Sequence, residues 1–387
     1  MQTNYDYILI GGGLAGRSLA YHLLQSPLRN KRIALIDPQA KSSDDRTWCF
    51  WERDPGPFEE VVSHRWDELQ FYSPSLSETL SIAPYVYKMI RGLDFYQYTD
   101  KAFDKAPQLT RIQEKVEKWE TRPNGKVQVS LSNGQTLLGD WGFSSFFPGS
   151  VDKEQYNYLD QHFKGWLIQT PHPAFDPAKA TFMDFRVPQD EGLSFLYVLP
   201  VSADRALVEL TFFSNRHFSS QEYDARLRKL IPEFVTTLPY EVTHSEMGSI
   251  PMTDYPFPRS DGKVIFIGTA GGHTKASSGY TFWRLQRNLL KLVSQLEKKG
   301  SPLPLPAIAP ARFGLFDSTM LHILEKGSPP GADLFADLFR HAAPDHVLKF
   351  LNEETTWKQD LKIMSSLPMF PFFKAFVAEV WKRMGFR

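Results

Sequence analysis

The stretch 5-YDYILIGGGLAGRSLAYHLLQ-25 contains the pattern that decides the fold. An apolar run typical of a β-strand leads into three glycines, and a helical pattern follows directly. Gly11, Gly13 and Gly16 have the spacing Gly-x-Gly-x-x-Gly, in which the missing side chains let the backbone approach a pyrophosphate. The positive end of the helix would stabilise the phosphate charge, and we include Leu14 and Ala15 in the same expected binding loop.

The next strand lies within 31-KRIALIDPQ-39 and ends in a carboxylate. Asp37 closes this strand 21 residues after Gly16, where a carboxylate can accept hydrogen bonds from a ribose. The glycine spacing alone is a weak signal. Strand, glycines, helix and terminal carboxylate together predict a dinucleotide-binding unit of the Rossmann type.

The segments after this unit favour FAD over NAD as the dinucleotide. A NAD-binding domain is usually completed by further βα units, whereas Asn124-Gly125 and Asn133-Gly134 indicate β-hairpins within 111–147. A second glycine segment, 268-GTAGG-272, appears late in the chain, after another apolar strand. This arrangement resembles the FAD-dependent hydroxylase-like flavoproteins, in which the late loop covers the ribityl chain and the flavin.

That resemblance implies further cofactor contacts. In the late loop they are Gly268, Thr269, Gly271 and Gly272. The loop usually begins Gly-Asp in these flavoproteins, so any hydrogen bond at this place must here come from Thr269 or from the backbone. Val116, in 112-IQEKVEKWE-120, lies where backbone groups hold the adenine in that family. A plain buried edge strand explains Val116 equally well.

Composition limits the class of protein. The 387 residues include 44 Lys plus Arg and 44 Asp plus Glu, so the net charge is zero and the basic footprint of a nucleic-acid binder is missing. The 30 Phe, 15 Tyr and 9 Trp suggest large apolar pockets or surfaces. A single cysteine, Cys49, excludes an internal disulfide and favours the reducing cytoplasm. We expect no signal peptide and no membrane-spanning segment, and no residue pattern predicts a metal site.

The order of patterns predicts an α/β protein with an interleaved domain organisation. We assign residues 1–80, 97–150 and 255–300 to a discontinuous FAD-binding domain, because the late strand and loop complete the N-terminal unit. Residues 81–96 and 151–254, dominated by strands, form an inserted, mostly antiparallel substrate domain. An amphipathic helix over 220–234 interrupts that sheet. The Pro-rich stretch 302–312 is a linker, and 301–387 forms a C-terminal helical region.

One strand of the inserted domain carries an unexpected charge. In 204-DRALVELTFFS-214, alternation places Ala206, Val208, Leu210 and Phe212 on one face and Leu207, Glu209, Thr211 and Phe213 on the other. Both faces are mostly apolar, so Glu209 has no obvious contact with water. Such a carboxyl either does chemistry in a dry pocket, pairs with a buried arginine or caps a sheet edge.

Six stretches together resemble one enzyme family over nearly the whole chain. They are 47-TWCFW-51, 87-YKMIRGLDFY-96, 182-FMDFR-186, 197-YVLPVSADRALVELTFFS-214, 246-EMGSIPM-252 and 267-IGTAGGHTKASSGYTF-282. The family is that of the flavin-dependent lycopene cyclases of carotenoid-making bacteria and plants. The resemblance implies a redox-neutral closure of the linear ends of lycopene into β-rings through a carbocation, giving γ- and β-carotene. It further implies reduced FAD as the active cofactor, NAD(P)H as the reductant, and Thr47 among the cofactor contacts.

The resemblance also implies a catalytic residue, because the family's acid/base glutamate matches Glu209. Protonating an alkene needs a strong donor in a dry pocket, and burial keeps a carboxyl protonated near neutral pH. Asp184 is a second candidate; it either orients Glu209 or the flavin, or merely pairs with Arg186. The stretch 350-FLNEETT-356 resembles the plant motif that carries this glutamate, but it follows the late loop instead of preceding it. We therefore expect Glu353 and Glu354 on a solvated face.

Less specific features leave alternatives open. Trp48, Phe50, Trp51 and Tyr280 are the aromatic candidates for stabilising a cation, and His273 is either a flavin-loop contact or a structural residue. The apolar and basic helix in 365–387 either dips into an anionic bilayer or packs on the core. The first choice predicts a cytoplasmic enzyme, peripheral on the inner membrane face. A flavin-dependent isoprenoid reductase, a monooxygenase or a carotenoid carrier remain the alternatives.

Overall fold

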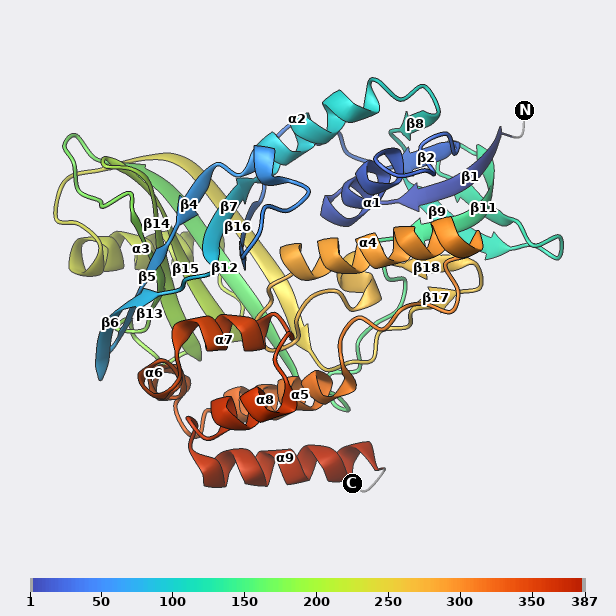
Figure 1. Ribbon diagram of the computed structural model, residues 1–387. Coiled ribbons are helices and arrows are strands. Elements are labelled where there is room, and N and C mark those ends of the chain that lie inside the picture. Colours follow the sequence, from blue (N-terminus) through green and yellow to red (C-terminus); the bar gives the residue numbers. More distant parts are fainter. Residues whose placement is uncertain (1–2, 385–387) are drawn as a thin grey trace.

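The computed structural model describes residues 3–384 and divides them into two sheet-based halves with a helical base (Figure 1). One half is an eight-stranded sheet in which β1 pairs in parallel with β2 and β11, β2 with β8, and β11 with β18. Side chains from α1 (Leu14–Leu24) and α4 (Phe282–Lys299) pack on this sheet in one apolar cluster. The strands are β1 (Thr3–Ile10), β2 (Ile33–Ile36), β8 (Leu109–Ile112), β9 (Val116–Thr121), β10 (Val127–Leu131), β11 (Thr136–Ser144), β17 (Ser260–Asp261) and β18 (Val264–Phe266).

The predicted hairpins and the late return of the chain are confirmed. Asn124-Gly125 joins β9 to β10, Asn133-Gly134 joins β10 to β11, and both glycines have positive φ. β18 adds to β11 and leads into the short 3₁₀ turn η2 (Gly268–Gly271), which lies beside the start of α1. The sheet is therefore completed by a strand from late in the sequence.

The second half is a seven-stranded, mainly antiparallel sheet in the order β16-β12-β15-β14-β13-β5-β6. Helix α3 (Ser220–Phe234), started by a Ser219–Glu222 capping box, covers one face through Tyr223, Leu227 and Ile231. Ala206, Val208, Leu210 and Phe212 point to this covered face. The strands are β5 (Glu68–Ser73), β6 (Leu76–Ser81), β12 (Tyr158–Gln169), β13 (Lys179–Asp184), β14 (Leu193–Ser202), β15 (Arg205–Ser214) and β16 (Glu241–Thr253).

The structure revises the boundary predicted at residue 80. β5 and β6 belong to the seven-stranded sheet, because β5 pairs in parallel with β13. Conversely, α2 (Gly92–Phe103) packs on α1 of the nucleotide half. A small third sheet, with β3 (Thr47–Glu52), β4 (His64–Trp66) and β7 (Val86–Arg91), lies between the halves, next to the 3₁₀ turn η1 (Glu59–Val61). The TWCFW stretch thus forms strand β3 of this small sheet.

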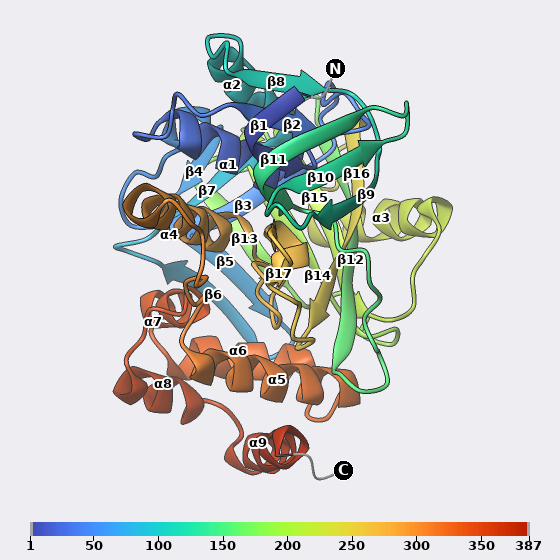
Figure 2. The same cartoon turned by 90° about the vertical axis from the view of Figure 1, so that its right-hand side faces the viewer.

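The C-terminal helices form the base of the molecule, and α9 is the outermost element in both views (Figures 1 and 2). Helix α9 is held to α5 by a Glu379–His322 contact of 2.7 Å and by Arg383, which donates to the Gly314 carbonyl at 2.7 Å. Within residues 3–384, no helix is long and apolar enough to cross a membrane. The helices are α5 (Ala311–Lys326), α6 (Gly331–His341), α7 (Pro344–Leu351), α8 (Trp357–Met364) and α9 (Met369–Arg383).

The expectation that Glu353 lies on a solvated face is wrong. Glu353 is 5% exposed, has a φ of 62°, and its carboxylate lies 3.0 Å from Arg284, 3.3 Å from Arg287 and 3.6 Å from Lys275. Arg284 also donates to the carbonyls of Gly272 and Thr274 in and just after the late loop. Glu353 therefore ties the C-terminal helices to that loop, whereas Glu354 is exposed as expected.

We predict that Glu353→Gln destabilises the fold by about 3–5 kcal/mol, because it leaves buried cations without their counter-charge. The measurement is the chemical unfolding midpoint of the purified chain. Glu354→Gln is the matched control and should change stability by less than about 0.5 kcal/mol. Equal stability of the two variants would contradict a structural role for Glu353.

Candidate active site

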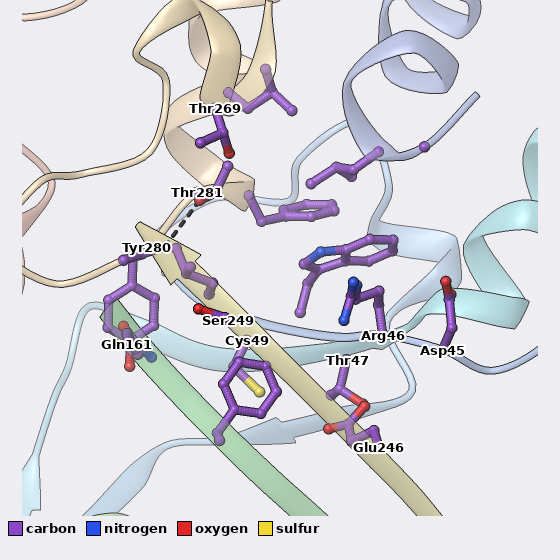
Figure 3. Close-up of a pocket in the computed structure, with 18 of the residues that line it drawn as sticks. Asp45, Arg46, Thr47, Cys49, Gln161, Glu246, Ser249, Thr269, Tyr280 and Thr281 are labelled. Carbon is purple, nitrogen blue, oxygen red and sulfur yellow. Dashed lines mark hydrogen bonds between the residues drawn. The ribbon is translucent and has the colours of Figure 1, made fainter. Parts of the chain in front are cut away.

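A cavity of about 510 Å³ lies where the two halves meet. Its wall comes from the start of α1, from β3, from the uncovered face of the seven-stranded sheet and from the late loop. Figure 3 shows side chains from these elements pointing into one space. The predicted site residues that line it are Gly13, Leu14, Ala15, Thr47, Glu209, Gly268 and Thr269.

The nucleotide end of the cavity has the shape that a pyrophosphate requires. A Cβ on Gly16 would lie 1.9 Å from the Gly11 carbonyl oxygen, and Gly11 itself has a φ of 101°. A Cβ on Gly13 would meet nothing within 4 Å, so this position borders open space. No side chain caps α1, whose first N–H groups are left for a ligand. The loop fits a dinucleotide phosphate.

The remaining predicted cofactor residues lie around this end without lining the cavity. Asp37 accepts hydrogen bonds from the backbone N–H groups of Gly12 at 2.7 Å and Gln39 at 2.8 Å, so it fixes the loop. Gly271 packs against the Phe266 carbonyl and Gly272 has a φ of 75°; both shape the late turn. Val116 begins β9, in the sheet behind.

His273 also lies behind the late loop. It is 4% exposed, with Nδ1 at 3.2 Å from the Gly268 carbonyl oxygen, and burial lowers its pKa. The structure therefore favours a structural role for His273.

The opposite end of the cavity is organised by one row of residues across four strands. Glu209 on β15 pairs with Tyr197 on β14 and with Gly165 on β12, and Gly165 pairs on its other side with Glu246 on β16. Residues directly opposite each other in a sheet point to the same face. Tyr197, Glu209 and Glu246 therefore all line the cavity, with a glycine between the two carboxylates.

Gly165 leaves the space that both glutamates use. A Cβ added there would lie 3.3 Å from Glu246 Cγ and 3.5 Å from Glu209 Cβ, so one methyl group would touch both side chains. Glu209 lies on an inner strand of the sheet, because β12 and β14 flank β15 on its two sides. Two carboxyl groups thus share one enclosed site.

Burial raises the pKa of Glu209, and the neighbouring Glu246 carboxyl raises this pKa further. A hydrogen bond from Thr211 at 2.9 Å lowers it in part. Burial also raises the pKa of Glu246, against a hydrogen bond from Thr47 at 2.9 Å that lowers it. Figure 3 shows Thr47 and Glu246 pointing toward each other, with Arg46 nearby. Two like charges at close range cannot both ionise easily, so the pair holds a proton near neutral pH.

Aromatic and apolar groups complete the wall around Glu209. The hydroxyl groups of Tyr197 and Tyr280 lie 3.3 Å apart, and Trp48 lines the cavity with them. Cys49 also borders the cavity, and burial raises the pKa of its thiol, which leaves it uncharged. Phe50 packs on Phe282 and Trp51 on Tyr280, one layer behind the wall.

A second, apolar cavity of about 430 Å³ continues from the first toward the helical base. The two cavities share Ser278 and Tyr280. Its wall is made mostly of Phe, Leu and Met side chains from the sheet and from α5, α6, α8 and α9. Among them, Phe372, Phe373 and Phe376 come from the outermost helix. The apolar cavity thus reaches α9, and the cavity next to it holds Glu209.

Asp184 lies away from both cavities' walls and pairs with Arg186. Its two oxygens accept hydrogen bonds from the Arg186 guanidinium at 2.8 and 2.5 Å, and the carboxylate is 2% exposed. Of the alternatives open for Asp184, the geometry favours the ion pair.

The family model described as "Lycopene cyclase protein" matches residues 6–377. The chain belongs to the lycopene cyclase family. Among curated relatives, the lycopene beta-cyclase of Pseudescherichia vulneris is 29% identical over 64% of this chain, and that of Pantoea ananas is 27% identical over 55%. The matches span 62% and 53% of those two relatives, less than two thirds of either.

Solved structures place this lycopene cyclase family member in the flavoprotein fold that the sequence predicts. A geranylgeranyl bacteriochlorophyll reductase-like protein from Thermoplasma acidophilum superposes with a TM-score of 0.68 at 13% identity, covering 97% of this chain and 99% of that one. A probable FAD-dependent monooxygenase from Pseudomonas aeruginosa gives 0.62 at 14% identity, covering 87% and 100%. The predicted hydroxylase-like fold is confirmed.

Glu246 is the functional candidate that sequence reasoning did not single out. It stands in 246-EMGSIPM-252, one of the stretches that resemble the family, but no local pattern relates it to Glu209. The available signal was the same as for Glu209, a carboxylate within an otherwise largely uncharged, family-typical strand. Only the pairing of β12 with both β15 and β16 brings the two together.

We predict that the stability of Glu209→Gln, relative to the wild type of this lycopene cyclase family member, increases as pH rises. Because the pKa of Glu209 is raised in the folded state, the folded chain still binds a proton at pH values where the unfolded chain has lost it. The wild type therefore loses stability as pH rises from the ordinary carboxyl pKa to the raised pKa of Glu209. Glutamine does not titrate. The difference in Tm between variant and wild type should be smallest near pH 4 and grow toward pH 8. A pH-independent difference would contradict a raised pKa at Glu209.

Proposed function

We propose that this chain is a flavin-dependent lycopene cyclase, an intramolecular lyase or isomerase that closes linear carotenoid ends into β-rings without net redox change. The observation that carries the proposal is Glu209, a carboxyl with a raised pKa in a cavity that adjoins an apolar cavity at the base of the molecule. The family assignment and the lycopene beta-cyclase relatives support the same substrate class.

FAD is the proposed cofactor. The glycine loop with the free start of α1 would hold the pyrophosphate, and the late loop with Gly268 and Thr269 would border the flavin end of the cavity. Reduced FAD, when bound, supplies an electron-rich ring system that favours positive charge nearby, and NAD(P)H is the proposed reductant. Asp37 and Gly271 support these loops from behind.

Glu209 is the proposed acid. Its carboxyl gives a proton to the terminal double bond, and the tertiary cation that results is attacked by a neighbouring double bond to close the ring. Tyr197 and Tyr280 present aromatic groups beside this carboxyl, and a desolvated cation–aromatic contact contributes about 2 kcal/mol. The enclosed wall keeps water from trapping the cation.

The apolar cavity at the helical base is the proposed channel for the rest of the polyene. A linear hydrocarbon offers no polar group for recognition, and most residues that line this cavity are Phe, Leu, Met, Ile and Val. Entry from the base would bring the chain end past Tyr280 and Ser278 to Glu209.

We further propose that α9 contacts the membrane in which such a polyene dissolves, at the cytoplasmic face. Apolar side chains on its outer side remain open to solvent: Met369, Phe370, Phe373 and Met384 are 76, 79, 66 and 67% exposed. Lys374, Lys382 and Arg383 are exposed on the same helix, which suits an anionic surface. The channel lining includes Phe373, so the mouth and the membrane-facing side share one helix.

The test of the proposed function uses lycopene in liposomes with the protein, FAD and a reductant. We predict ring formation at unchanged product mass, dependent on reduced FAD. Glu209→Gln should lower the rate by about 10²–10⁴-fold while leaving flavin binding intact, since it removes a general acid. Glu354→Gln, a glutamate on the surface, is the control and should remain active.

Other products would identify the alternatives suggested by the fold. A gain of two hydrogens would indicate a reductase, a gain of oxygen a monooxygenase, and tight binding without any product a carotenoid carrier. Normal turnover by Glu209→Gln would show that β15 does not carry the catalytic acid.

The membrane proposal predicts that Phe370→Asp with Met384→Asp weakens binding to phosphatidylglycerol-containing vesicles at least about tenfold. Burying one such side chain is worth about 1.5–3 kcal/mol, and the charge adds a further penalty. Co-sedimentation measures the bound fraction. Leu290→Asp on α4, an exposed apolar residue remote from α9, is the control; equal binding by all three proteins would refute the role of α9.

A further inference from the structure

The proposed cyclisation needs two proton transfers, and the site holds two carboxyl groups. One proton must reach the terminal double bond, and another must leave the ring after closure. Glu209 accounts for the first transfer under the proposed function. Glu246 faces the same cavity, is 6% exposed and stands opposite Glu209 across Gly165. A role for Glu246 in the second transfer rests on the proposed function and adds to it.

We propose that Glu246 is the base that removes the ring proton, so that the two glutamates divide acid and base work between them. Their surroundings differ in the direction this requires. Glu246 receives a hydrogen bond from the Thr47 hydroxyl, which favours its charged form; Asp44 and Asp45 oppose that form and the Arg46 guanidinium supports it. Among residues 3–384, no cation contributes to the pKa of Glu209, and its one side-chain hydrogen bond comes from Thr211. When one proton is shared, Glu209 keeps it and Glu246 carries the charge.

The steps balance in protons and electrons. The Glu209 O–H bond breaks, a C–H bond forms at the terminal alkene, and the alkene electrons leave a tertiary cation. The neighbouring double bond forms the ring bond and moves the cation to the adjacent ring carbon. The Glu246 carboxylate then takes a ring proton, and the electrons of that C–H bond form the ring double bond. No electron is gained or lost overall.

After one closure the proton has moved from Glu209 to Glu246, so it must return before the next. Gly165 lies between the two residues in the sheet, and a Cβ there would contact Leu207, Glu246 Cγ and Glu209 Cβ, so the missing side chain leaves room between the two glutamates. The glycine is therefore a positioning residue, because it lets the shared proton pass between the carboxyl groups directly or through one water molecule. The site is reset without any outside acid or base.

The decisive variant is Glu246→Gln, assayed for rate and for ring type. We expect ring formation to fall by about 10²–10⁴-fold. We also expect rings with the double bond at other positions, because the cation then loses a proton to another acceptor from a neighbouring carbon. Glu246→Asp, which restores a carboxyl, should return the product to β-rings. Glu241→Gln, on the exposed start of β16, is the matched control and should match the wild type.

Ring type separates a base from a merely structural residue. If Glu246→Gln forms β-rings only, at whatever rate, the proposal is overturned. A wild-type chain that forms no rings from lycopene would overturn the proposed function itself, which is a separate result. Flavin content and Tm report whether the variant has folded.

Gly165→Ala provides a second test that leaves both glutamates in place. Its methyl group would sit between them, so we expect the first ring closure to be slowed less than the steady-state rate, because only later turnovers need the returning proton. A rapid-quench time course measures both. Equal slowing of the two phases, or none, would overturn the shared-proton cycle.

Discussion

The site depends on how β12 pairs with its two neighbours. A sheet register that shifts by one residue turns every side chain to the opposite face, so the placement of Glu209 and Glu246 in one cavity is a property of pairing. β12 meets β15 and β16 at the same residue, Gly165, and its missing side chain prevents the two carboxyl groups from being separated by a wall. The α3 side of the sheet secures that register through apolar packing.

The acidity of the site comes from what surrounds it. The nucleotide half, the small sheet with TWCFW and the seven-stranded sheet surround the glutamates, so their charges lose part of their contact with water. This burial raises the pKa values of Glu209 and Glu246, and it also lowers the stability of the fold when either carboxyl ionises. Under the proposed function the same wall would protect a carbocation, so proton donation and cation survival would have a single physical cause.

Local sequence patterns predicted much of this structure, and the errors share one origin. The glycine spacing, the hairpin dipeptides and the alternation around Glu209 are short-range signals, and each was confirmed as structure. The sheet membership of β5, the partnership of Glu246 and the burial of Glu353 depend on contacts between distant segments. Glu353 has the sequence context of a polar helix end, and its contacts with Lys275, Arg284 and Arg287, far away in the chain, make it a core residue.

The bonds of Arg284 give the late loop a second anchor outside the cavity. Its guanidinium holds the carbonyls of Gly272 and Thr274 on one side and the Glu353 carboxylate on the other. Loosening that carboxylate would therefore disturb a loop that it never touches. In a genetic screen for loss of function, substitutions at position 353 would group with those in the late loop, although Glu353 does not line the cavity. The effect of a substitution at Glu353 would thus be transmitted through Arg284 to the loop, and would not depend on how near Glu353 lies to the cavity.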